Sequence, residues 1–357
     1  MPKPAAEFNL HLLYKGKVQI REYPVSHKYL IHDAENNRNW EQTPSATGLT
    51  GKMEKGAGLM MYAMSEAMKY MDRSMSNKSL KAAVEDENYT FKQLFKDARL
   101  AHRAKSDLGK RVGTAAHGYV EELLRALKKA EDTRSQFIVP LVPMALDLHA
   151  DLSASLASML SVYKFEKIEH AERYAEVVKK DVQNRGLIWQ ESMMIQNACE
   201  AARQFFATAA KQGAIKVWGV EQIVHSRKYF YSGKFDSVLE FVRPFTWRGY
   251  TIPVGLYVSD FKTSNPGTDY PMGIYPNFLA QIGLYDEALS EEFPELDAKI
   301  TGHLLLGSSK TGAGFHPYVS LNRERNRAWA RSLVPVMEYM HQGEQELRGL
   351  DLYGANK

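Results

Sequence analysis

The chain has 357 residues, of which 44% are hydrophobic and 25% charged, and its formal net charge is +4. This length and composition suit one large globular domain with an elaboration, or two domains, and they exclude disorder on a large scale. No stretch reaches the ~20 apolar residues of a membrane span, and the amino terminus lacks the pattern of a secretory leader, so we expect a soluble cytoplasmic protein without a membrane partner.

The first part of the chain predicts a short β-hairpin followed by helices. Alternating apolar residues over Val18–Tyr23 and Lys28–His32 favour two paired strands. Apolar residues at helical spacing over Leu59–Tyr70 and Phe91–Ala104 predict two helices that pack beside the core. A further helix is expected around His117, with small residues on either side of the imidazole.

Two long helical patterns follow Pro140 and Pro143, which break the chain. The first pattern covers Leu146–Asp181 and the second Ile188–Gln212. Because the segment between the His117 helix and the predicted sheet is longer than a compact core requires, we interpret the first pattern as an insertion. The second has apolar residues at helical spacing and is expected to pack on the sheet.

The last part of the chain predicts an α/β sandwich. Alternating and apolar runs predict four strands, and helical periodicity predicts two helices. The strands are Val217–His225, Phe230–Phe241, Val254–Lys262 and Ile300–Leu306, and the helices are Tyr275–Ser290 and Arg323–Gln345.

Two charged residues at the end of one predicted strand are the best indication of function. Alternation in the strand places Asp260 and Lys262 on one face and Phe261 on the other. A hairpin with the preceding strand would bring Asp236 beside Asp260. Two carboxylates and a lysine suit a Mg²⁺ ion that activates water against a phosphodiester. The alternative is that the Asp-x-Lys tripeptide forms a structural ion pair or a solvated edge.

Several short motifs follow one another in the order Gly113-Thr-Ala-Ala-His117, Glu221, Gly233 to Asp236, Asp260-Phe-Lys262, and Gln281 with Tyr285. In this order they resemble the RecB-like exonuclease branch of the PD-(D/E)XK nuclease superfamily, as found in phage-encoded and mitochondrial genome maintenance exonucleases. Upstream, Thr43-Pro44-Ser45-Ala46-Thr47 is similar to a Pro-Ser-x-Thr element near the amino end of that family.

The resemblance implies an α/β fold: a PD-(D/E)XK restriction-endonuclease-like core with a mixed central sheet flanked by helices, plus a helical insertion. It divides the chain into a DNA-contacting and helical segment packed on the core (residues 1–100), the nuclease core (101–135 and 186–345), the insertion (136–185) and a tail (346–357). Such insertions arch over the cleft in related exonucleases and thread a single strand. A packing buttress is the alternative for Leu146–Asp181.

The resemblance also implies a metal centre. Its ligands would be His117, Asp236, Asp260 and the backbone carbonyl of Phe261. Glu221 would help to place a water or a second ion, and Lys262 would orient or deprotonate the attacking water. Oxygen-rich ligation favours Mg²⁺ or Mn²⁺. An iron-sulfur cluster needs four thiolates, and since the chain has only Cys199, both a cluster and an internal disulfide are excluded.

Contacts to DNA are expected from residues outside the metal centre: Ser45, Thr47, Gln281, Tyr285, Lys110 and Arg111. Tyr285 has an alternative as a core aromatic residue with a buried hydroxyl. A second basic cluster, which either pairs with phosphates or forms a solvated helix face, consists of Arg323, Arg325, Arg327 and Arg331.

Taken together, these features predict a Mg²⁺-dependent DNA exonuclease. Its substrate would be single-stranded DNA or DNA with a free end, in phage or bacterial DNA replication, recombination or repair. A phage-encoded enzyme would act in the cytoplasm of its bacterial host. A structure-specific endonuclease with the same metal centre is the main alternative, and a non-catalytic DNA-binding protein is a weaker one.

Overall fold

A computed structural model describes residues 7–24, 28–51, 91–140, 142, 187–264, 275–312 and 314–335. The predicted helix Leu59–Tyr70 and the predicted insertion Leu146–Asp181 lie outside the described residues, as does the carboxy-terminal tail. The predicted arch therefore stays a prediction. Of the predicted helix Arg323–Gln345, residues 323–335 are described, and they are helical.

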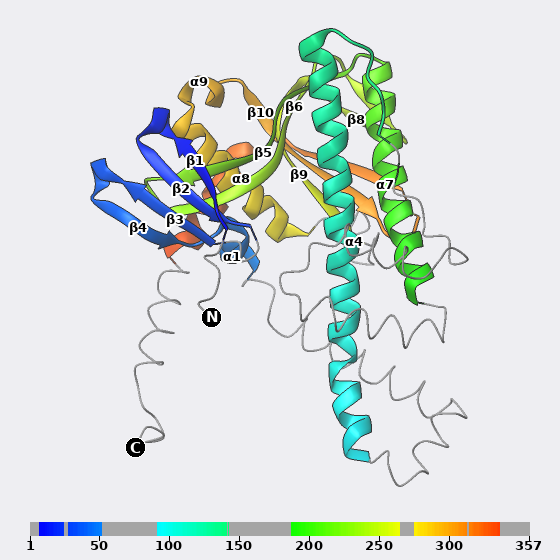
Figure 1. Ribbon diagram of the computed structural model, residues 1–357. Coiled ribbons are helices and arrows are strands. Elements are labelled where there is room, and N and C mark those ends of the chain that lie inside the picture. Colours follow the sequence, from blue (N-terminus) through cyan, green and yellow to red (C-terminus); the bar gives the residue numbers. More distant parts are fainter. Residues whose placement is uncertain are drawn as a thin grey trace, which may run out of the picture.

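A mixed central sheet organises the main body of the protein (Figure 1). Within the described residues its strand order is β11-β10-β9-β6-β5. Strands β9 and β10 are parallel, and the other neighbouring pairs are antiparallel. The strands are β5 (Ile215–Ser226), β6 (Tyr231–Phe241), β9 (Gly255–Ser264), β10 (Ile300–Ser309) and β11 (Phe315–Ser320). This confirms the expected mixed α/β architecture.

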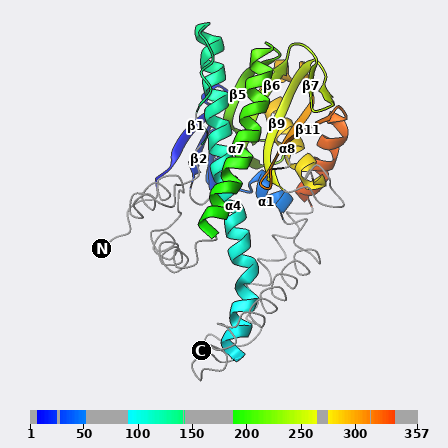
Figure 2. The ribbon, with the colours of Figure 1, turned by 90° about the vertical axis from the view of Figure 1, so that its right-hand side faces the viewer.

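Helices cover both faces of this sheet. On one face, α4 (Phe91–Thr133) and α7 (Leu187–Lys211) lie side by side (Figure 2), and their apolar residues share a core with Phe261 of β9. On the other face, α8 (Pro276–Glu292) and α1 (Ala46–Gly51) share a core with Val258. The short helix α9 (Pro294–Asp297) follows α8. Neighbouring residues of β9 thus face opposite layers, as the alternation predicts.

A second sheet precedes α1 in the chain and is drawn in blue in Figure 1. It is an antiparallel meander in the order β1-β2-β3-β4. Its strands are β1 (Asn9–Leu13), β2 (Val18–Tyr23), β3 (Lys28–Asp33) and β4 (Arg38–Thr43), joined by the 3-10 turns η1 (Tyr14–Gly16) and η2 (Ala34–Asn36). The pairing of β2 with β3 confirms the predicted hairpin. Sequence reasoning missed β1 and β4.

Three further features differ from the expectations. The chain from Phe91 to Thr133 forms one long helix, where the sequence indicated two helical segments. The turn-rich stretch between β6 and β9 contains the small hairpin of β7 (Phe245–Trp247) and β8 (Tyr250–Ile252). In the described parts of the chain, no helix has the length and apolar character needed to cross a membrane.

Candidate active site

Three acidic residues lie in one row across three neighbouring strands. The ladder between β6 and β9 ends at Ser237 and Ser259, and Asp236 and Asp260 are the next residues on the two strands. The register with β5 places Asp236 opposite Glu221. The charge of Asp236 contributes to the raised pKa of Asp260, so the two carboxylates are neighbours, as predicted.

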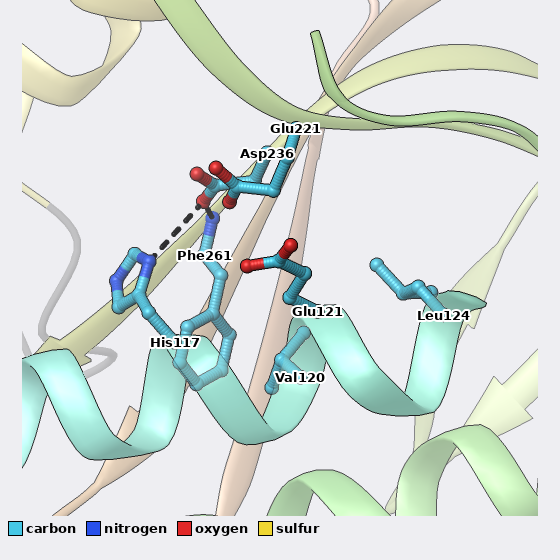
Figure 3. Close-up of a pocket in the computed structure, with 7 residues that line it drawn as sticks. All are labelled: His117, Val120, Glu121, Leu124, Glu221, Asp236 and Phe261. Atoms are coloured by element: carbon cyan, nitrogen blue, oxygen red, sulfur yellow. Dashed lines mark hydrogen bonds and ion pairs between the residues drawn. The ribbon is translucent and has the colours of Figure 1, made fainter. Parts of the chain in front are cut away.

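The Asp236 carboxylate lies where β6 and β9 separate. Its Oδ2 accepts a hydrogen bond from the backbone amide of Phe261 at 2.5 Å and lies 3.7 Å from Nδ1 of His117 (Figure 3). Helix α4 presents His117, whose ring packs edge-on against the ring of Phe261 with centroids 4.8 Å apart. The small residue Gly113, one turn earlier, is close to Thr263 of β9, since an added Cβ would lie 3.0 Å from its Oγ1.

Asp260 and Lys262 face each other, as their spacing predicts. The Lys262 ammonium lies 2.6 Å from Oδ2 of Asp260, and it also lies 5.1 Å from the ring centroid of Phe278 on α8. Asp260 is only 2% exposed. Its buried Oδ2 therefore has the Lys262 ammonium as its partner within the protein.

Glu221 occupies an unusual place in β5. Its backbone has a φ of +52°, a left-handed conformation that is rare for a glutamate within a strand. The side chain is paired with the Lys234 ammonium on β6 at 2.7 Å. Such backbone conformations cost free energy and are concentrated at functional sites. Lys234 was missed by sequence reasoning, although its position two residues before Asp236 on the same strand was available.

Burial shifts the pKa values of the ionisable groups in the row. Burial, followed by the nearby Asp236 charge, raises the pKa of Glu221 to about 7. Burial also raises the pKa of Asp260 to about 6, despite Lys262, and it raises the pKa of Asp236. Desolvation and the Lys262 ammonium lower the pKa of His117 to about 4, so the imidazole is neutral at pH 7 and can act as a ligand. Clustered shifts of this kind mark functional sites.

Several of these residues line a small pocket between α4 and the sheet. It is lined by His117, Val120, Glu121, Leu124, Glu221, Asp236 and Phe261 (Figure 3). Helix α4 supplies one wall, and the strands supply the other. Glu121 adds a further carboxylate, one that sequence reasoning quoted but did not assign to the site.

Three of the predicted DNA contacts, two on α8 and one on α1, lie within hydrogen-bond distance of one another. Gln281 Nε2 donates to the Tyr285 hydroxyl at 2.7 Å and lies 3.3 Å from the hydroxyl of Thr47, which is itself 3.3 Å from the Tyr285 hydroxyl. Tyr285 and Gln281 are buried, whereas Thr47 is exposed. Tyr285 thus has the geometry of the alternative considered above, a core aromatic residue with a satisfied hydroxyl. Direct DNA contact by this group stays a prediction.

The remaining predicted DNA contacts have structural partners. Ser45 Oγ accepts the backbone amide of Gly48 at 3.0 Å, so it caps the first turn of α1. Arg111 on α4 makes two hydrogen bonds, both 3.0 Å, with the buried carboxylate of Glu191 on α7. This pair ties the two helices together. Lys110 is exposed on α4.

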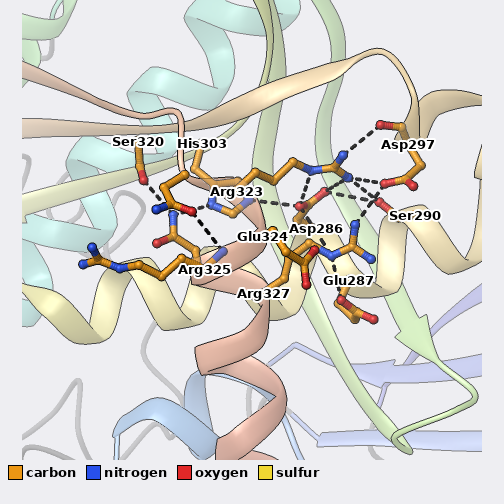
Figure 4. A network of polar contacts seen from close by, with 12 residues as sticks. Asp286, Glu287, Ser290, Asp297, His303, Ser320, Arg323, Glu324, Arg325 and Arg327 are labelled. Carbon is orange, nitrogen blue, oxygen red and sulfur yellow. Dashed lines mark hydrogen bonds and ion pairs between the residues drawn. The ribbon is translucent and has the colours of Figure 1, made fainter.

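Three arginines of the carboxy-terminal cluster are paired with carboxylates of the protein, whereas the fourth, Arg325, is exposed. Asp286 of α8 accepts hydrogen bonds from Arg323 and from His303, while Arg327 and Arg331 bind Glu287 (Figure 4). Asp286 and His303 are both fully buried. The sequence could not indicate this network, because its acidic members lie on another helix about 40 residues earlier in the chain.

The site fits a divalent cation in the chemistry of its donors. Carboxylates dominate, as Mg²⁺ prefers. Among the described residues, however, no group of three or more His, Cys, Asp or Glu side chains is already gathered as a ligand set. Asp260 and Glu221 are paired with lysines instead. Binding a cation would therefore require these side chains to exchange partners.

Comparison of the sequence with protein-family models and with curated proteins gave no match. The functional argument consequently depends on the motifs and on the geometry of the acidic row.

Proposed function

We propose that this protein is a Mg²⁺- or Mn²⁺-dependent DNA nuclease with a PD-(D/E)XK centre of the RecB-like type. The observation that supports it best is the row of Glu221, Asp236 and Asp260 across β5, β6 and β9, with Lys262 against Asp260. The row was expected from short motifs of one nuclease family. Its members are brought together by strand pairing from three separate stretches of the chain.

Each side chain has a chemical part in the proposal. Asp236, Asp260 and the Phe261 carbonyl would hold the cation with the neutral His117 imidazole, and Glu221 would help to place a water. When bound, the cation would neutralise charge that develops on the scissile phosphate. Lys262, held by Asp260 at 2.6 Å, would orient or deprotonate the attacking water. By family resemblance, the product carries a 5′ phosphate.

The substrate class in the proposal is single-stranded DNA, or DNA with a free end. The biological setting would be DNA replication, recombination or repair in a phage or bacterium. A structure-specific endonuclease would use the same carboxylates, because the ligands determine the chemistry while access to the site determines where the strand is cut. The two possibilities therefore need substrates that differ in their ends.

The test measures Mg²⁺-dependent cleavage of end-labelled linear single-stranded and double-stranded DNA, with a closed single-stranded circle in parallel. Asp260→Asn and Lys262→Ala should each lower the rate at least about 100-fold, because loss of positioned acid–base groups costs that much or more. Asp132→Asn and Lys216→Ala serve as matched controls, since both side chains are exposed and distant from the row.

The outcomes separate the candidates. Degradation of the linear strands with the circle intact supports an exonuclease, whereas equal cutting of the circle supports the endonuclease. Wild-type rates in folded Asp260→Asn or Lys262→Ala would contradict the site assignment. If the wild-type protein binds DNA but hydrolyses none in Mg²⁺ or Mn²⁺, the catalytic proposal is wrong.

A further inference from the structure

The two faces of the β1–β4 sheet have opposite chemistry. Alternation along the strands puts the buried residues Val18, Ile20, Tyr29 and Ile31 on the inner face, where they pack with Ile223 of β5. The outer face carries aromatic, basic and apolar side chains: Phe8, Leu10, Arg21, Tyr23, His32 and Trp40. This face is turned away from the main body, and it needs its own explanation.

A layer of π systems and cations covers the outer face. The guanidinium carbon of Arg21 lies 3.5 Å from the ring centroid of Trp40 and 5.0 Å from that of Phe8. His32 stacks on Trp40 with centroids 5.5 Å apart and planes 26° apart, and Phe8 contacts Tyr23 at 5.9 Å. These rings are held in place by one another, so little side-chain freedom would be lost on binding a planar group.

A distortion in the backbone puts Trp40 into this layer. The register between β3 and β4 shifts between Ile31 and His32, and Trp40 has a φ of +55°. Such a bulge adds a residue to one strand and redirects its side chain. A left-handed conformation is strained for a tryptophan and is retained where the position has a role.

The charge on the outer face is of one sign. The acidic residues of the strands face inward or are already paired: Glu22 and Asp33 are buried, and Glu41 binds Arg38. Among the described residues, no carboxylate forms an ion pair with Arg21, and its Nε is buried without a hydrogen-bond partner. The surface therefore suits an anionic partner.

We propose that the outer face of the β1–β4 sheet binds single-stranded DNA by stacking bases on Trp40, Tyr23 and Phe8, with the Arg21 guanidinium moving from the Trp40 ring to the phosphates as a base takes its place. Single strands offer unstacked bases and a negative backbone, which match aromatic and basic groups interleaved on one surface. In duplex DNA the faces of the bases are stacked on one another and cannot stack on protein rings. A protein partner would not need to supply a negative charge for Arg21. The proposal deepens the nuclease function and depends on it for the choice of DNA as ligand.

The chain itself connects this surface to the candidate active site. Strand β4 runs from Trp40 to Thr43, about 10 Å at the usual strand rise. The Thr43 hydroxyl donates to Ser232 of β6 at 2.9 Å, and the segment continues to Thr47 beside Tyr285. A strand held on the outer sheet would thus enter the nuclease site from the side of α1.

The test measures binding of a fluorescent oligothymidine by anisotropy, using full-length protein that carries Asp260→Asn, in buffer with a chelator, so that the DNA stays intact. Adding Trp40→Ala should weaken binding about 5- to 150-fold, the range found for loss of one stacked base. Trp40→Phe should retain most of the affinity, since any aromatic ring can stack, and it guards against misfolding. Trp218→Ala is the control, because Trp218 is an exposed tryptophan on β5.

A second variant tests the charge independently. Arg21→Gln should weaken binding and should make its salt dependence shallower by about 0.7 in log–log slope, as expected for one phosphate contact to a single strand. Unchanged affinity in both Trp40→Ala and Arg21→Gln would overturn the proposal. If these variants no longer self-associate in sedimentation but bind DNA as before, the proposal is also overturned, and the face is identified as a protein interface.

The result can be separated from that of the nuclease proposal. If the wild-type protein does not cleave DNA but Trp40→Ala still lowers single-strand affinity, the binding surface stands and the catalytic proposal fails. If cleavage is confirmed but Trp40→Ala binds normally, the binding surface fails alone.

Discussion

Replacing Asp286 with asparagine should strongly destabilise the protein without touching the acidic row. Asp286 is fully buried on α8 and accepts hydrogen bonds from His303 Nε2 at 3.0 Å and from Arg323 Nε and Nη2 at 2.6 and 2.7 Å (Figure 4). Asparagine has nearly the same size but no charge, and its amide hydrogens would face donors. The guanidinium of Arg323 would then lose its main counter-charge.

The expected cost is about 3 kcal/mol of unfolding free energy. Breaking a buried ion pair by removing one partner costs about 3–5 kcal/mol. The lower end applies here, because Arg323 is 16% exposed and retains Asp297 as a partner. Urea denaturation should show a lower midpoint with an unchanged slope. Glu324→Gln is the control: Glu324 is 72% exposed, so its pairing with Arg331 should contribute less than about 1 kcal/mol.

The effect should depend on pH with a definite sign. Burial alone would raise the pKa of Asp286, but hydrogen bonds from His303 and Arg323 outweigh it and lower the pKa to about 2, against 3.8 in the unfolded chain. A carboxyl with a lowered pKa stabilises the fold fully above the unfolded value, and the contribution is lost as pH falls toward the folded value. The gap between wild type and Asp286→Asn should therefore be constant from about pH 5 to 7 and shrink below about pH 4. A gap under about 1 kcal/mol at pH 7, or one that persists unchanged at pH 3, would refute this reasoning.

Three further changes test individual contacts. Gly233→Ala would place a Cβ 2.6 Å from Cε1 of Tyr285, so it should lower stability by about 1–3 kcal/mol in thermal unfolding and reduce cleavage. His117→Ala should raise the Mn²⁺ or Mg²⁺ concentration needed for half-maximal cleavage, and an unchanged metal titration would remove this imidazole from the site. Arg111→Gln should lower stability by about 2 kcal/mol, because the buried Glu191 carboxylate loses the charge of its guanidinium partner. Unchanged DNA affinity in that variant would assign Arg111 to helix packing alone.

Local pattern was sufficient to predict the central strands. β9 and β10 alternate or run apolar over many residues, so their predicted and observed bounds agree within a few residues. β4 could not be found in this way, because its sequence is polar or charged at every position except Trp40 and it is held by pairing with β3. The β7–β8 hairpin was missed because its strands have three residues each, too few for a period to be visible.

In the candidate site, the contact between Asp260 and Lys262 was predictable from their spacing, whereas the partners of other residues were not. The order of the motifs indicated Asp236, Asp260 and Lys262, and strand pairing follows from the alternation of β6 and β9. The partners of Arg111 and Ser45 depend on which elements meet in three dimensions, so a basic or hydroxyl side chain read from sequence alone suggested DNA. For the same reason the arginines of the carboxy-terminal helix suggested phosphate binding, although most of them form ion pairs with carboxylates of α8.

The acidic row lies where the ladder between β6 and β9 opens, and this location explains its chemistry. The Asp236 side chain, and not a backbone carbonyl, accepts the amide of Phe261, so the strands can separate here without leaving that donor unpaired. The opening exposes carboxylates to one another in a poorly solvated place, which raises the pKa of Asp260 and of Glu221. Such an arrangement costs stability at neutral pH. The Asp286 network, through His303 of β10, joins α8 to the same sheet.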